Sequence, residues 1–202
     1  MKSMQSSDFN KVFETFRKQT YPEREKGDKF ERLMQRYLQT GPIYKDRFSD
    51  IWLWSEFFCR TTFAGGKDFG VDIVCRAKFG DYWAVQCKFY DKGTPITKED
   101  ADTFFSTSSK QFTGNITGQT TQFAERFWTS TTDKWSNNAK ETIRNQQSQV
   151  HEIGLSTLED TAEDWEQLTN GISGKKTQQP KKTVREHQQK ALECTSNNLS
   201  KI

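Results

Sequence analysis

Three polar residues in the middle of the chain have types and spacing that could support chemistry. Asp72 lies in one short apolar segment, and Gln86 and Lys88 lie two residues apart in the next. Side chains two apart in a strand share a face, so Gln86 and Lys88 are expected to point the same way, with Cys87 opposite. A turn near Gly80 would bring Asp72 opposite Lys88, to within a residue or two. The sequence therefore predicts a carboxylate, an amide and an ammonium in one small patch.

Other kinds of reactive site are poorly supported by the residues present. The chain has only two histidines, His151 and His187, and both lie in polar surroundings far from any other reactive cluster. This argues against a nucleophilic site that depends on histidine. The spacing of the four cysteines matches no zinc-binding pattern, and we expect reduced thiols. Chemistry in this chain is expected to depend on carboxylates, amides and lysines.

Two predicted strands must carry the polar patch. Residues 70–76 and 82–90 are both rich in β-branched and aromatic residues. Between them, Phe79-Gly80-Asp81 has the composition of a turn, so a β-hairpin is expected. An aromatic segment at 51–54 is expected to form a further strand ahead of this hairpin.

Predicted helices flank these strands. The strongest runs from Asp28 to Gln39, with Asp28 as N-cap and Glu31 three residues on, which is the spacing of a capping box. Gly41 and the proline after it are expected to end this helix. The remaining expected elements are helices over 8–17, 98–109 and 137–147, strands over 123–131 and 150–155, and a loop over 111–121.

Composition sets the limits within which these elements must fold. The 202 residues carry a net charge of +3 and have a mean hydropathy of −0.93, which is low for a protein with a buried core. The 16 Phe, 6 Trp and 5 Tyr side chains can supply that core, because each buries a large area. No apolar run is long enough to cross a bilayer, and the first ten residues have no signal-peptide pattern, so a cytoplasmic protein is expected.

The order of elements and polar residues resembles the PD-(D/E)XK nuclease family, in its Mrr-like D…QxK variant. The helix of Glu31, the aromatic strand and the hairpin with Asp72, Gln86 and Lys88 follow the order of that nuclease core. The chain is similar, more closely still, to the N-terminal nuclease domain of Type ISP restriction-modification enzymes and related large predicted helicases. The segments that carry this closer resemblance are 51–54, 86–91, 130–135 and 164–165.

The resemblance implies an α/β fold, a restriction-endonuclease-like core with a mixed central sheet flanked by helices. It also implies Mg²⁺-dependent cleavage of double-stranded DNA, with Mn²⁺ as a substitute ion. In the family, the residues that match Asp72, Gln86 and the carbonyl of Cys87 bind the metal, because Mg²⁺ takes hard oxygen ligands. The residue that matches Lys88 acts on the attacking water and the phosphate, and Glu31 matches an acidic residue that binds through water.

The C-terminal segment supplies a separate indication. Residues 174–182 have the composition of a basic linker, and 185–192 resemble the Q motif that opens a helicase-like ATPase, with Gln188 as the residue that reads adenine. The chain has no phosphate-binding P-loop, so ATP would act only through a motor domain that is absent here. We therefore expect a nuclease-like domain over 1–170, followed at 171–202 by the start of a motor. The remainder of a larger polypeptide would carry the ATPase, methyltransferase and target-recognition parts.

Simpler interpretations remain open for each of these residues. Glu31 is explained by the capping box alone, Asp72 by a position facing solvent, and Gln86 with Lys88 by the polar face of an edge strand. The alternative function is a catalytically silent nuclease-like module that binds DNA or docks onto a helicase-like motor.

Overall fold

The computed structural model describes residues 8–19, 21–60, 70–113, 118–146 and 149–171. The predicted basic linker and the Q-motif-like segment with Gln188 lie outside these residues.

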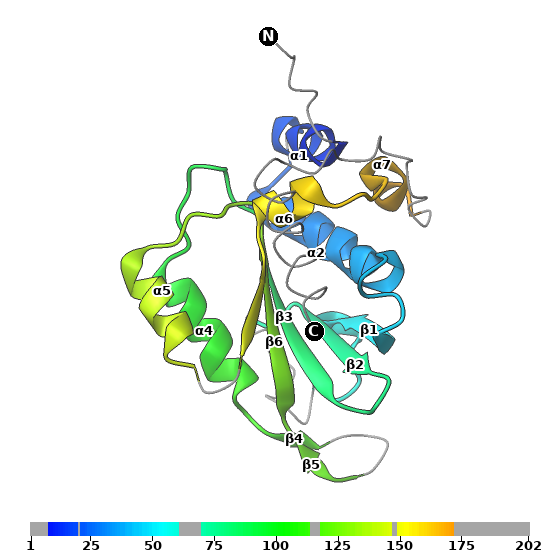
Figure 1. Cartoon of the computed structure of the whole chain (residues 1–202), viewed down its shortest axis with the longest axis vertical. Coiled ribbons are helices and arrows are strands. Elements are labelled where there is room, and N and C mark those ends of the chain that lie inside the picture. The colour runs from blue at the N-terminus through cyan, green and yellow to red at the C-terminus, as the bar shows by residue number, and fades with distance from the viewer. Residues whose placement is uncertain (1–7, 20, 61–69, 114–117, 147–148, 172–202) are drawn as a thin grey trace, which may run out of the picture.

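A five-stranded mixed sheet forms the centre of the molecule (Figure 1). Its strands, in spatial order, are β1 (Phe48–Leu53), β2 (Ile73–Ala77), β3 (Tyr82–Lys88), β6 (Phe123–Ser130) and β7 (Val150–Ile153). The first three pair antiparallel, whereas β3, β6 and β7 run parallel. The predicted α/β fold with a mixed central sheet is therefore confirmed.

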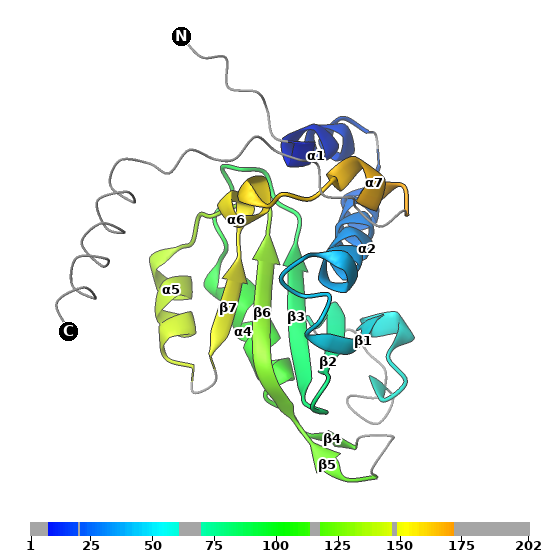
Figure 2. The ribbon, with the colours of Figure 1, turned by 45° about the vertical axis from the view of Figure 1, so that its right-hand side comes forward.

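Helices cover both faces of this sheet (Figures 1 and 2). One face packs against α2 (Glu23–Thr40), with α1 (Asp8–Lys18), α6 (Leu155–Asp160) and α7 (Trp165–Thr169) around it; the other packs against α4 (Lys98–Ser108) and α5 (Asn137–Arg144). Aromatic side chains fill both layers, as the composition predicts: Phe30 and Phe127 in the first, Phe104 and Trp128 in the second. No helix within the described ranges is long and apolar enough to cross a membrane.

The start of α2 differs from the prediction. The helix begins at Glu23, with Pro22 at the N-cap position and no side-chain cap, so Asp28 and Glu31 lie inside it. Pro22 has no N–H and a fixed φ, which suits the start of a helix, and the glutamates that follow favour the positive end of its dipole. The predicted capping box is therefore wrong, and it no longer explains Glu31.

The predicted loop over 111–121 is also partly wrong. It contains two short strands, β4 (Phe112–Thr113) and β5 (Thr120–Thr121), which pair antiparallel. The Phe112 ring lies 5.0 Å from that of Phe123 and 5.3 Å from that of Tyr82, measured between ring centroids. This aromatic anchor gives a polar segment enough buried surface to form a small hairpin. A single 3₁₀ turn, η1 (Trp54–Glu56), follows β1.

Candidate active site

The register of the β2–β3 hairpin determines which polar residues meet. Ile73 pairs with Val85 and Val74 with Ala84, and the Asp72 N–H donates to the Val85 carbonyl at 2.9 Å. This register places Asp72 next to Gln86 and not opposite Lys88, so the predicted pairing is off by two residues. The ladder is symmetric about residue 79, one position before the predicted centre, and Gly80 takes the turn conformation with a φ of +103° that favours glycine.

Asp72 is held at the end of the hairpin by two short hydrogen bonds. Its Oδ2 accepts from Gln86 Nε2 at 2.5 Å and from the backbone N–H of Cys87 at 2.6 Å. Asp72 is 8% exposed and Gln86 4% exposed, so the interpretation of Asp72 as a solvent-facing strand residue is wrong. Burying a carboxylate is costly, and these donors offset that cost while they fix its orientation.

Lys88 lies at the end of β3 and pairs with a residue that the sequence did not single out. Its Nζ is 3.3 Å from Asp100 Oδ1 on α4, and the Tyr90 hydroxyl donates to the same oxygen at 2.8 Å. Asp100 also forms a capping box with Thr97. Burial raises the pKa of Asp100, but hydrogen bonds from Thr97 and Tyr90 and the charge of Lys88 outweigh it, and the net pKa is lowered. Asp100 therefore stays ionised and fixes the Lys88 ammonium.

One signal in the sequence could have identified Asp100. Thr97 and Asp100 have the spacing of a capping box at the start of the helix predicted over 98–109. That signal gives the cap, but it says nothing of a contact with Lys88.

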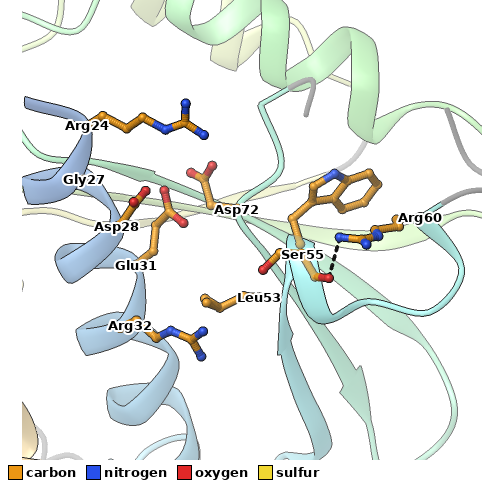
Figure 3. Close-up of a pocket in the computed structure, with 10 residues that line it drawn as sticks. Arg24, Gly27, Asp28, Glu31, Arg32, Leu53, Ser55, Arg60 and Asp72 are labelled. Atoms are coloured by element: carbon orange, nitrogen blue, oxygen red, sulfur yellow. Dashed lines mark hydrogen bonds between the residues drawn. The ribbon is translucent and has the colours of Figure 1, made fainter. Parts of the chain in front are cut away.

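A cavity of about 900 Å³ opens between α2 and the ends of β1 and β2. Figure 3 shows the carboxylates of Asp28, Glu31 and Asp72 directed toward one another in it, with Arg24 extending over them. Arg32 and Arg60 lie at its margins. The structure thus brings Glu31 and Asp72 to one cavity, Gln86 contacts Asp72 from β3, and Lys88 is held on the α4 side.

The donors near Asp72 fit a cation that prefers oxygen ligands. Within the described ranges, no cluster of three or more His, Cys, Asp or Glu side chains could hold a metal, so any site must combine carboxylates with amide or backbone oxygens. Asp72, Glu31, the Gln86 amide and the Cys87 carbonyl offer such a mixed set, which suits Mg²⁺. Burial, more than the nearby charges of Asp72 and Glu31, raises the pKa of the Cys87 thiol well above its usual value.

The Gln86 amide is oriented with its nitrogen toward Asp72. Its Oε1 faces Gly70 instead, where a Cβ atom would lie only 3.1 Å from that oxygen. A cation at Asp72 that takes the Gln86 oxygen therefore requires the amide to turn over. Gly70 has a φ of +89° and no side chain, so it leaves room beside the amide.

Comparisons with known proteins agree with the nuclease resemblance. A family model described as a restriction endonuclease, Mrr_cat_2, matches residues 39–175, a range that includes Asp72, Gln86 and Lys88 and begins after Glu31. No curated protein matches the chain.

Two solved structures illustrate the likeness. The ATP-dependent Type ISP restriction-modification enzyme LlaBIII, bound to DNA, is 28% identical with a TM-score of 0.58 over 94% of this chain, which spans 11% of that enzyme's chain. The MspJI restriction endonuclease, in complex with a 27-mer oligonucleotide, is 16% identical with a TM-score of 0.47. The match covers 81% of this chain and 32% of the MspJI chain.

Proposed function

Because the chain belongs to the restriction endonuclease family whose model it matches, we propose that it hydrolyses phosphodiester bonds of double-stranded DNA with Mg²⁺, as the nuclease domain of a larger ATP-dependent restriction-modification enzyme. The observation that carries the proposal is the placement of Asp72. Its carboxylate is fixed by Gln86 and Cys87 at the edge of a cavity that Glu31 also lines. The similarity to LlaBIII, of which this chain spans 11%, supports the larger enzyme.

Four residues would hold the ion. Asp72, the Gln86 amide oxygen and the Cys87 carbonyl would bind it directly, and Glu31 would bind it through water. When bound, the ion would supply Lewis-acid chemistry to the scissile phosphate. Turning the Gln86 amide over would give up its hydrogen bond to Asp72, and the backbone N–H of Cys87 would still hold the carboxylate.

Lys88 would supply positive charge at the reacting phosphate. A fixed cation stabilises the charge that develops in phosphodiester hydrolysis, and it is most effective when it does not have to reorient. Asp100 supplies that fixation here, because its carboxylate, to which the Tyr90 hydroxyl donates, pairs with the ammonium at the end of β3.

The test is DNA cleavage by wild type and Asp72→Asn, with Mg²⁺ or Mn²⁺, on duplex DNA and in the context of the full-length enzyme. Loss of the carboxylate is expected to lower the rate by at least about 100-fold. The matched control is Asp81→Asn, at an exposed aspartate after the hairpin turn, which should cut at the wild-type rate. Equal cutting by Asp72→Asn and wild type would contradict the site. DNA binding without cutting, by wild type in the full-length enzyme, would favour a catalytically silent module.

A further inference from the structure

Arg24 differs from the other arginines of the Asp72 cavity, because it has no partner among the residues that the structure describes. It extends from α2 over the carboxylates (Figure 3), yet it forms no ion pair or hydrogen bond within the described part of the chain. Arg32, by contrast, donates to Glu56 Oε1 at 2.5 Å, and Arg60 donates to the Ser55 carbonyl at 2.5 Å. Two of the three guanidinium groups are therefore engaged by the fold, whereas Arg24 is available to a ligand.

The carboxylates beneath Arg24 do not take up its charge. Asp28 lies four residues further along the same helix, a spacing at which opposite charges often pair, but the two side chains do not form an ion pair. Glu31 and Asp72 lie deeper in the cavity, where the proposed cation would bind. With that cation in place their charge is taken up, and the N–H donors of Arg24, which form no bond among the described residues, are left for a ligand in the cavity.

We propose that Arg24 binds a phosphate of the DNA backbone and holds the strand over the Asp72 carboxylate. The planar guanidinium presents paired N–H donors that match the oxygens of a phosphate. The inference rests on the proposed function in one respect, that DNA is the substrate of this cavity. It adds a residue that lies outside the range matched by the family model.

The experiment measures binding of the full chain to a short DNA duplex as a function of salt, with Ca²⁺ in place of Mg²⁺ to limit cutting. Each phosphate that a protein neutralises contributes about 0.9 to the slope of log affinity against log salt. Arg24→Gln is expected to lower that slope by about 0.9 and the affinity about five- to tenfold at low salt. Arg24→Lys, which keeps the charge but not the fork of donors, should keep most of the slope and lose part of the affinity.

Arg144→Gln is the matched control. Arg144 is also an exposed helical arginine without an ion pair or hydrogen bond in the described ranges, but it lies on α5, on the other face of the sheet. Its removal makes the same change in net charge and should leave the slope unchanged. A wild-type slope in Arg24→Gln, or an equal fall in Arg144→Gln, would overturn the proposal.

The same variants separate this inference from the nuclease function. If Asp72→Asn abolishes cutting while Arg24→Gln binds as wild type does, the nuclease function stands and the phosphate contact is wrong. If wild type never cuts but Arg24→Gln lowers the slope, the phosphate contact stands and the nuclease function is wrong.

Discussion

Two cavities on opposite faces of the sheet each contain arginine, and they use it differently. The Asp72 cavity, beside α2, has Arg24 above three carboxylates, and Arg24 forms no ion pair or hydrogen bond with any residue that the structure describes. A smaller cavity of about 280 Å³, under α4 and α5, has Arg126, which is 5% exposed and donates to the Ser108 and Ser109 hydroxyls at 2.8 and 3.0 Å. An arginine in a cavity therefore indicates a ligand site only where its N–H donors are not already bonded to the protein.

The surroundings of Arg126 explain why it needs no carboxylate. Its guanidinium also lies 3.4 Å from the Ser108 carbonyl at the end of α4, where the helix dipole favours a cation. Among the described residues that line its cavity none is acidic. Burial lowers the pKa of Arg126, and the nearby charge of Glu125 acts against that effect. Arg126 thus serves as a C-terminal cap for α4, and its charge is used by the fold.

The largest effect on stability is expected from Arg126→Met. The change leaves the buried hydroxyl oxygen and the carbonyl of Ser108 without their donor, and each unsatisfied buried group costs about 1–3 kcal/mol, so the free energy of unfolding should fall by about 2 kcal/mol or more. Arg24→Met should leave it unchanged, because Arg24 has no bond to lose in the described structure. Urea unfolding of both variants measures the difference. Equal stabilities would remove the contrast between the two cavities.

Lys88 combines the properties of Arg126 and Arg24, because it pairs with Asp100 of the protein and is also proposed to act on DNA. Asp100→Asn is expected to lower the cleavage rate about tenfold, as the loss of a residue that orients a functional group does. Asp102→Asn is the control, since Asp102 pairs with Lys98 on the same helix and does not contact Lys88. Equal losses of cleavage rate in both variants would show that the substitutions act only by destabilising α4.

Asp100 also gives a prediction for the dependence of stability on pH. Its pKa is lowered in the folded chain, so its stabilising effect is present above its unfolded pKa and is lost as the pH falls through its folded value. The stability difference between wild type and Asp100→Asn should therefore be constant near pH 7 and shrink below about pH 4. Thermal unfolding across that range measures it, and a difference that grows in acid would contradict the assignment.

The sequence predicted local features of the site better than contacts between distant elements. Strand alternation placed Gln86 and Lys88 on one face, and the composition of the hairpin predicted that the strand after Asp72 pairs with the strand of Gln86 and Lys88, because both depend on neighbours in the chain. The register was off by two residues, since it depends on which turn residues close the hairpin.

Contacts that tertiary packing creates were not predictable in this way. Asp100 meets Lys88 only because the crossover from β3 to β6 lays α4 against the sheet. The hydrogen bonds of Arg126 likewise depend on where the end of α4 meets β6. Helical periodicity gives the buried face of an element, but it does not identify the residue on the neighbouring element that it contacts.

Glu31→Gln tests whether Glu31 belongs to the ligand-binding cavity or only to its helix. The Mg²⁺ concentration that gives half-maximal cleavage should rise about tenfold, because loss of a carboxylate that binds the ion through water weakens a metal site by about that factor. Glu23→Gln, in the first turn of the same helix, is the control. If the half-maximal Mg²⁺ concentration were unchanged and the free energy of unfolding fell, Glu31 would have a structural role only.

The smallest effect expected is that of Ser109→Ala, which removes one hydrogen bond to Arg126 and should lower the free energy of unfolding by about 0.5–1.5 kcal/mol. The informative quantity is the coupling with Arg126→Met. Once the arginine is gone, Ser109→Ala has no such bond to break, so the double variant should be less destabilised than the two single variants added together. Simple additivity would mean that Ser109 does not hold the guanidinium. Arg126 would then be held by the Ser108 hydroxyl and carbonyl alone, and part of its guanidinium would be left for an anion in the smaller cavity.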